Sequence, residues 1–256
     1  MSDHKLDVNF KVDVPPSVDD AIGNLTNKPA TSLGSGFADI FDLVFGPFSY
    51  LKQKQQIKYS AKLEQFKTEI NDKINSIPEE NLKEPDLQTV ATALDSSKYC
   101  LDSNELRNMF ANLISSTMDT RYCSQAHPSF AEIIKQMSPL DAQNLALFKN
   151  KDYPIAEYRR EYKESASFTI ILTNVFLGNE SENDLDIQSS SISNLSRLGL
   201  IEVPFDTYYS DESRYKPFGE TSLFLTHKSL KEDLVIQKGI VRKTPLGKSF
   251  INVCLP

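Results

Sequence analysis

The sequence predicts a mainly α protein with a C-terminal α+β part, in which an N-terminal helical bundle is followed by a winged-helix-like domain. One long and two shorter amphipathic segments precede residue 138, and their apolar residues recur at helical spacing. Beyond that point, β-branched runs alternate with short capped helices. We therefore expect a loosely packed or disordered tail over residues 1–35, a helical domain over 36–137 and a winged-helix-like domain over 138–256.

Composition limits the classes of function. The 256 residues carry a formal net charge of -7. Lys and Arg number 14 against 19 Asp and Glu in residues 1–137, and 14 against 16 in residues 138–256, so neither half has the basic excess of a general nucleic-acid binder. The cysteines are three and widely spaced, which argues against a zinc site and fits a reducing cytosol. With no signal-peptide pattern and no membrane-length apolar run, we expect a cytoplasmic protein.

The stretch GSGFADIFDLVFGPFSY is unusually rich in phenylalanine. Its GSG lacks the GK[ST] ending of a phosphate loop, which argues against nucleotide binding. Packing against the rest of the protein or a partner subunit is the favoured interpretation. A membrane-surface helix stays open, although Asp39 and Asp42 occupy the polar side where cations are usual. The predicted contact face consists of Phe37, Ile40, Phe41, Val44, Phe45 and Phe48.

Three helices are expected next. The first spans residues 48–77 and ends before Pro78. The second covers roughly residues 87–99, and the third starts near Asp102 or Ser103, either of which can cap it. Their apolar stripes would be buried against one another in an antiparallel bundle.

Residues 127–143, HPSFAEIIKQMSPLDAQ, pose the choice between catalysis and structure, because His127 precedes Glu132 by five residues. Pro128 suits a first helical turn, and Ser138-Pro139-Leu140-Asp141 repeats the start signal with serine as N-cap, proline at N1 and an acid at N3. We interpret the stretch as a joint between two helices. The alternative is a hydrolase or nuclease that uses His127, Asp119 or Glu132, but no nucleophile or metal-ligand set lies nearby in the sequence.

After residue 138, the pattern predicts a helix in SPLDAQNLALFKN, a β run in FTIILTNVF and a polar helix in SSSISNLSRLGL. Gly199 is expected to end that helix in a left-handed conformation before the strand LIEV. An irregular segment follows, with a wing expected around Arg214, Lys216 and Lys228. The chain closes with a strand and a short helix that Thr244 caps, with Pro245 at N1.

A winged helix raises the alternative of DNA binding, through the penultimate helix and the wing. That helix offers serines, Asn194 and only one cation, Arg197, while Asp184 and Asp186 just before it would repel phosphates. We therefore favour packing or protein contact over DNA recognition. The predicted nucleic-acid contacts are Ser193, Asn194, Arg197, Arg214 and Lys216.

Several blocks together resemble the Abi-alpha family of bacterial proteins, which is associated with abortive infection, the arrest or death of a phage-infected cell. The blocks are FADIFDLVFGPFSYLKQK, KINSIPEENLKEPDLQ, ELRNMFANLISSTMD, HPSFAEIIKQMSPLDA, LSRLGLIEV and VRKTPLGKSFINVCL. The resemblance covers about residues 33–256 and implies a role in anti-phage defence. It supplies no catalytic residues to transfer.

The function expected from the sequence is a non-enzymatic defence protein that acts through protein or membrane contacts. A winged-helix transcriptional regulator is the alternative. A protein partner or self-association is expected, and DNA or a membrane surface is a less favoured partner. Neither a cofactor, a metal nor a small-molecule substrate is predicted.

Overall fold

The computed structural model describes residues 41, 44–45, 53–162, 164–230 and 234–256, and the account below concerns these residues. The chain divides into two compact units, residues 1–60 and 61–256, each of which is described by itself. In the first unit, Phe41, Val44 and Phe45 are helical and buried, and the ring centroids of Phe41 and Phe45 lie 4.7 Å apart. Helix α3 (Gln53–Asn75) begins in this unit and continues into the second.

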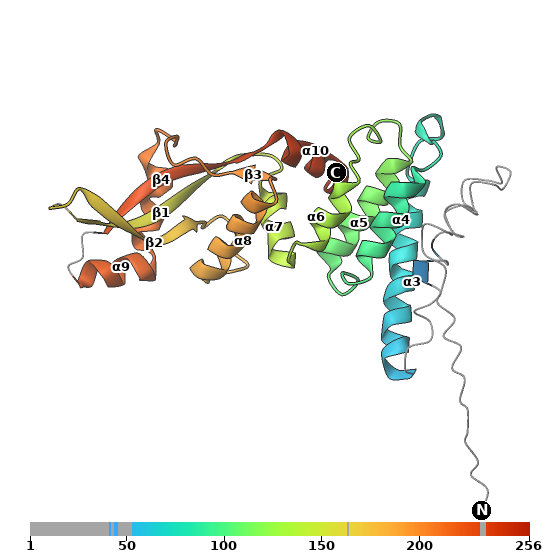
Figure 1. Ribbon diagram of the computed structural model, residues 1–256, viewed down its shortest axis with the longest axis horizontal. Coiled ribbons are helices and arrows are strands. Elements are labelled where there is room, and N and C mark those ends of the chain that lie inside the picture. The colour runs from blue at the N-terminus through green and yellow to red at the C-terminus, as the bar shows by residue number, and fades with distance from the viewer. Residues whose placement is uncertain (1–40, 42–43, 46–52, 163, 231–233) are drawn as a thin grey trace, which may run out of the picture. The chain divides into compact units, whose positions relative to one another are not determined.

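The first part of the second unit is helical (Figure 1). After α3 come the short 3₁₀ helix η2 (Glu79–Asn81), α4 (Leu87–Ser97), α5 (Asn104–Thr117) and α6 (Ser129–Lys135). Asp86 caps α4, and Ser103 caps α5 by accepting a hydrogen bond from the Leu106 N–H. Helices α4, α5 and α6 pack against one another and bury apolar side chains in a shared core. The long helix α3 ends at Asn75, just before Pro78, where the sequence predicts its end.

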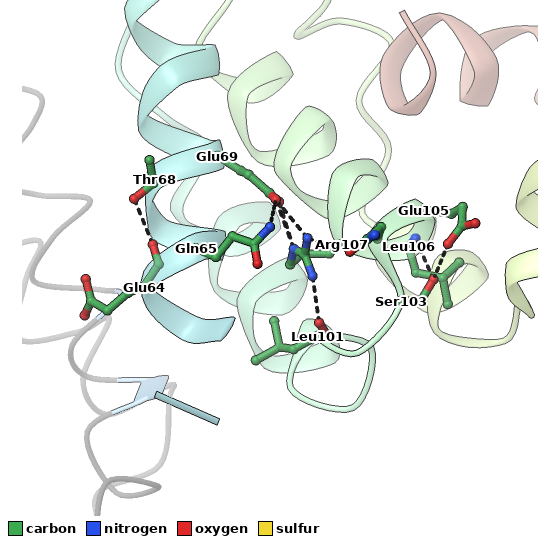
Figure 2. Close-up of polar contacts among 10 residues, drawn as sticks. Glu64, Gln65, Thr68, Glu69, Leu101, Ser103, Glu105, Leu106 and Arg107 are labelled. Atoms are coloured by element: carbon green, nitrogen blue, oxygen red, sulfur yellow. Dashed lines mark hydrogen bonds and ion pairs between the residues drawn. The ribbon is translucent and has the colours of Figure 1, made fainter. Parts of the chain in front are cut away.

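An ion pair fastens α3 to α5. Arg107 is 3% exposed, and its Nε and Nη2 donate to both carboxylate oxygens of Glu69 at 2.9–3.2 Å. Figure 2 shows the two side chains pointing toward each other from α3 and α5. The same guanidinium donates to the Leu101 carbonyl and to Asn104 Oδ1, each at 2.9 Å, so its donors are well satisfied despite burial.

The second part of this unit is α+β. Helix α7 (Pro139–Leu147) leads to the antiparallel strands β1 (Tyr153–Tyr162) and β2 (Ser167–Val175), and α8 (Leu185–Arg197) follows them. Strand β3 (Ile201–Glu202), the 3₁₀ helix η3 (Glu212–Glu220), α9 (Ser222–Ser229), β4 (Leu234–Lys243) and α10 (Pro245–Cys254) complete the chain. The sheet has the order β2-β1-β4-β3, with every neighbouring pair antiparallel.

The mainly α class with a C-terminal α+β part is confirmed, but the helical-bundle and winged-helix assignments are not. The segment where a wing was expected forms η3 and α9 instead of a β excursion. Its helical form follows from burial, because Tyr215 and Phe218 pack with Tyr158 of β1 in one apolar cluster. The predicted division at residue 137 lies within the second unit, where α10 packs on α5.

Two polar side chains of α5 hold α10 in place. Asn112 Nδ2 donates to the Cys254 carbonyl at 2.9 Å, and Ser116 Oγ donates to the Val253 carbonyl at 3.2 Å. These carbonyls belong to the last turn of α10, where no intrahelical donor is available. Asn112 and Ser116 therefore cap the end of a helix that lies more than a hundred residues away in sequence.

Candidate functional site: the α7–α8 groove

The joint between α6 and α7 forms as the sequence predicts. Ser138 Oγ accepts the Asp141 N–H, Asp141 Oδ2 accepts the Ser138 N–H, and Pro139 is at N1, which completes a capping box. His127 lies just before α6, where its Nδ1 accepts the Ser129 N–H at 3.1 Å and lies 2.7 Å from Ser129 Oγ. The predicted capping or loop position of His127 is therefore confirmed.

The carboxylates considered for catalysis have structural partners. Asp119 is buried, and Arg121 donates to both of its oxygens at 2.6–3.1 Å. This hydrogen bonding lowers the pKa of Asp119 below its ordinary value. Glu132 accepts a hydrogen bond from Ser96 and lies 3.6 Å from the Lys135 ammonium. Among the described residues, no three His, Cys, Asp or Glu side chains are grouped as a metal site would need.

Helix α8 is tied to the joint by Asn194 and Arg197. The Asn194 amide donates to the Gln136 carbonyl at 3.0 Å and to Asp141 Oδ2 at 2.9 Å. Arg197 fixes that amide by donating to Asn194 Oδ1 from Nε and Nη2, and it also reaches Gln136 Oε1. Two residues predicted to touch DNA thus hold α8 against the end of α6 and the start of α7.

The serine-rich side of α8 is attached to β2. Ser189 Oγ donates to the Thr173 carbonyl at 2.7 Å, and Asn174 Nδ2 donates to Ser193 Oγ at 2.9 Å. Asn174 has a φ of 51°, and the β1–β2 register shifts beside it, so the bonds form where the strand is irregular. Ser193, another predicted DNA contact, is therefore used within the fold.

The remaining predicted nucleic-acid contacts lie in η3. Arg214 stacks over the Tyr209 ring at 4.3 Å and lies 3.6 Å from Asp211, while Lys216 is exposed. Since these two cations are in η3 and the other three predicted contacts hold α8 to its neighbours, the structure gives no support to a winged-helix DNA interface.

A buried polar network joins α7 to α8. Asn144 is fully buried and donates to Gln188 Oε1 at 3.0 Å and to Ser191 Oγ at 2.9 Å, while its own Oδ1 accepts from Asn179. Gln188 is 1% exposed and donates to two loop carbonyls before α8. A network so fully satisfied fixes the relative position of the two helices.

Gln143 connects this region to α5. Its Nε2 donates to Glu105 Oε1 at 2.9 Å, and its Oε1 accepts from Ser181 Oγ at 3.1 Å. The hydrogen bond from Gln143 is the main cause of a lowered pKa at Glu105. The α7–α8 pair is thus joined to the helical part by side chains as well as by the backbone.

A groove of about 550 Å³ lies between α7 and α8. Its volume is within the ~300–1,000 Å³ that ligand sites usually occupy. We call it the α7–α8 groove, and its lining residues are Ser138, Pro139, Leu140, Asp141, Gln143, Ser181, Glu182, Ile187, Ser190, Ser191 and Asn194.

Asp141 is the unusual member of this lining. It is 2% exposed, and its Oδ1 is buried with no hydrogen-bond partner in the described structure. A buried carboxylate oxygen without a donor is costly, and native proteins hold few such atoms. Ile187, on the opposite helix, is by contrast 48% exposed, which leaves an aliphatic side chain at the surface of the groove. The groove therefore combines an unsatisfied acceptor with exposed apolar surface.

Sequence reasoning identified Ser138 and Asp141 only as a helix start and did not predict the groove. A partial signal was present, because Asn144, Gln188 and Ser191 are polar residues at positions that a purely apolar helix face would fill. The groove itself depends on a contact between Asp141 and Asn194, which lie 53 residues apart.

The predicted Phe-rich contact face is described only in part. Phe37, Ile40 and Phe48 lie outside the described residues, and the three that are described, Phe41, Val44 and Phe45, are each 2% exposed. Their contact with a partner or a membrane stays a prediction. In the parts of the chain that the structure describes, no helix has the length and apolar character needed to cross a bilayer.

Comparisons with known proteins identify the family of the chain. The family model described as abortive infection alpha matches residues 58–254. None of the curated proteins matches the sequence. A solved structure of an uncharacterized protein from the hydrocarbon-degrading marine bacterium Alcanivorax borkumensis SK2 is similar at 14% identity, covering 54% of this chain and 96% of that one, with a TM-score of 0.35. Because the family match spans both the helical part and the α+β part, the chain belongs to the abortive infection alpha family.

Proposed function

We propose that the protein is a non-enzymatic component of bacterial abortive infection that acts by binding a partner protein at the α7–α8 groove. Membership of the family supports the defence role, and the groove between α7 and α8 supports a contact site there. In this proposal the α+β part is a rigid platform in the bacterial cytoplasm, where binding or release of the partner halts growth of the infected cell.

The observation that carries the proposal is the buried Asp141 Oδ1, which has no donor in the described structure although Asp141 lines the groove. A partner that places positive charge over the groove would offset this under-solvated carboxylate and so stabilise its own complex. The exposed Ile187 adds apolar area that contact with a partner would cover. Both groups belong to helices that are held rigidly, which reduces the ordering cost of binding.

A contact role also agrees with how the polar residues of the joint are used. His127 and Asp119 both serve local hydrogen bonds, and Glu132 is bonded to Ser96. The proposal therefore expects His127→Ala to keep phage protection. A DNA-binding role is less favoured because Asn194 and Arg197 are engaged within the fold.

The test is a plaque assay with cells that carry the gene. Ile187→Asn and Ser190→Phe change the groove, since Ser190 is exposed and lines it, and both variants should lose most of the protection. Leu225→Asn is the matched control, because Leu225 is a 49% exposed leucine on α9 that does not line the groove. Thermal unfolding of each purified variant confirms that it folds. Full protection by both groove variants would refute the proposal.

A further inference from the structure

The α7–α8 groove is acidic. Asp141 and Glu182 are the charged residues of its lining, which contains no lysine or arginine. Asp184 and Asp186 lie at the start of α8 beside it. The N-termini of α7 and α8 each contribute about half a positive charge, and Arg197 is bonded to Asn194 of the lining. Together they offset roughly two of these four carboxylates and leave an excess of negative charge.

The protein supplies no donor to one oxygen of this acidic lining. Asp141 Oδ2 accepts from the Ser138 N–H and from Asn194 Nδ2, whereas Oδ1 accepts from no described group. Glu182 keeps capacity as well, because within the described part of the chain only its Oε1 accepts a hydrogen bond, from the Asp184 N–H. The groove is therefore complementary to a group that donates several hydrogen bonds and carries positive charge.

The apolar part of the lining narrows the class of ligand. Pro139 and Leu140 come from α7 and Ile187 from α8, and Ile187 is 48% exposed. Lysine and arginine combine a cationic head with an aliphatic stem that packs on such surface. Pro139, Ile187 and Ser190 are exposed, so the groove is accessible to a side chain carried on another polypeptide.

From this complementarity, and on the basis of the proposed function, we infer that the α7–α8 groove binds an arginine or lysine side chain of the partner protein. The cationic head donates to Glu182, the charge of Asp141 just beneath the surface attracts it, and the stem lies along Ile187. Arginine is the preferred residue, because its planar guanidinium can bind the Glu182 carboxylate with two parallel hydrogen bonds.

Binding is measured by titrating the ¹⁵N-labelled full chain with three probes while its amide chemical shifts are followed. N-acetyl-arginine N-methylamide imitates the partner side chain. The citrulline analogue has the same shape without the charge, and ethylguanidinium has the same single charge without the peptide groups. The arginine probe should shift the Ile187 and Ser190 amides, with affinity about tenfold higher than that of the citrulline probe, since charged donors make the stronger hydrogen bonds. Its affinity should fall as salt is added.

Variants locate the binding. Glu182→Gln should lower the affinity for the arginine probe several-fold. Glu180→Gln should leave that affinity unchanged, because Glu180 is an exposed acid two residues away that does not line the groove. Asp141→Asn should abolish the preference for arginine over citrulline. Because Asp141 also caps α7, Ser190→Phe provides a second test that leaves the capping box intact and should block the probe.

Equal affinity for the citrulline probe, or shifts outside the groove, would overturn the inference. Ethylguanidinium binding as tightly as the arginine probe would also overturn it, since the site would then recognise a free guanidinium and not an arginine side chain carried on a polypeptide. If no probe binds but the groove variants lose phage protection, the inference fails and the proposed function stands. If the probe binds in the groove but Ile187→Asn and Ser190→Phe protect normally, the proposed function fails.

Discussion

Replacing Glu69 by alanine would leave the Arg107 guanidinium without its ion-pair partner in a place where water hardly reaches it. Arg107 is 3% exposed and cannot lose its proton, whereas the Glu69 side chain is 28% exposed. Removing one member of a buried ion pair costs about 3–5 kcal/mol. Since the Leu101 carbonyl and Asn104 still accept from Arg107, we expect the lower end of that range, about 3 kcal/mol.

The reverse change should cost less. Arg107→Met leaves a carboxylate that is partly hydrated already, so the loss of its charged hydrogen bonds is expected to cost about 2 kcal/mol. The double variant lacks both charges and should lose about 3 kcal/mol, which gives a coupling energy of about 2 kcal/mol between the two side chains. Glu69→Ala should cost more stability than Arg107→Met because Arg107 is the more buried of the two charges, not because more hydrogen bonds are lost.

Urea unfolding of the purified chain, followed by circular dichroism, measures these differences. In thermal unfolding of a unit of this size, the same loss of stability in Glu69→Ala corresponds to a fall of about 6–12 °C in the melting temperature. Glu64→Ala is the control, because Glu64 is an exposed acid on the same helix, and its effect should stay within about 0.5 kcal/mol. If Glu69→Ala unfolds like Glu64→Ala, the ion pair does not fasten α3 to α5.

Three further outcomes follow from other contacts. Asn112→Leu removes a donor to the end of α10 and should cost about 1–2 kcal/mol in urea unfolding, whereas Asn108→Leu, at an exposed position of α5, should cost under about 0.5 kcal/mol. In thermal unfolding, Gly247→Ala should destabilise strongly, because its Cβ would lie 1.9 Å from a carbonyl oxygen, and Gly219→Ala should be tolerated because the nearest atom to its Cβ would be 3.7 Å away. Because the pKa of Asp119 is lowered, its ionised carboxylate stabilises the fold at pH values above the unfolded pKa of about 4, and this stabilisation is lost as pH falls through the folded pKa. In urea unfolding, the wild type should therefore lose its stability advantage over Asp119→Asn in acid. An advantage that persists in acid would contradict this cause.

Signals that depend on a few neighbouring residues could be predicted from the sequence. The Ser138–Asp141 capping box, the Thr244 cap with Pro245 at N1, and the left-handed Gly199, with a φ of 74°, all form as expected. Each depends on local hydrogen bonding or on the steric freedom of one residue, which the sequence states directly. The helix–helix joint was identified for the same reason.

Features created by tertiary contacts were not predictable in this way. Strand β1 was not expected, because YPIAEYRREY is rich in charge and poor in β-branched residues, yet pairing with β2 and β4 on its two sides makes it an inner strand of the sheet. The segment expected to hold a wing is helical because it packs on Tyr158 of β1, whose hydroxyl donates to the Phe218 carbonyl at 2.7 Å. The groove requires α7 and α8 to meet, and no local pattern specifies that meeting.

The central claim is that a partner protein occupies the α7–α8 groove when the defence operates. The most direct measurement places a photo-crosslinking amino acid at position 183, an exposed residue beside Glu182 of the groove lining, in cells challenged with a restricted phage, with position 225 as the control site. A single protein adduct should form from position 183 and not from 225, and across Glu182→Gln and Ile187→Asn its yield should fall in step with phage protection. Protection with no adduct at position 183, or with an equal adduct at position 225, would contradict the account.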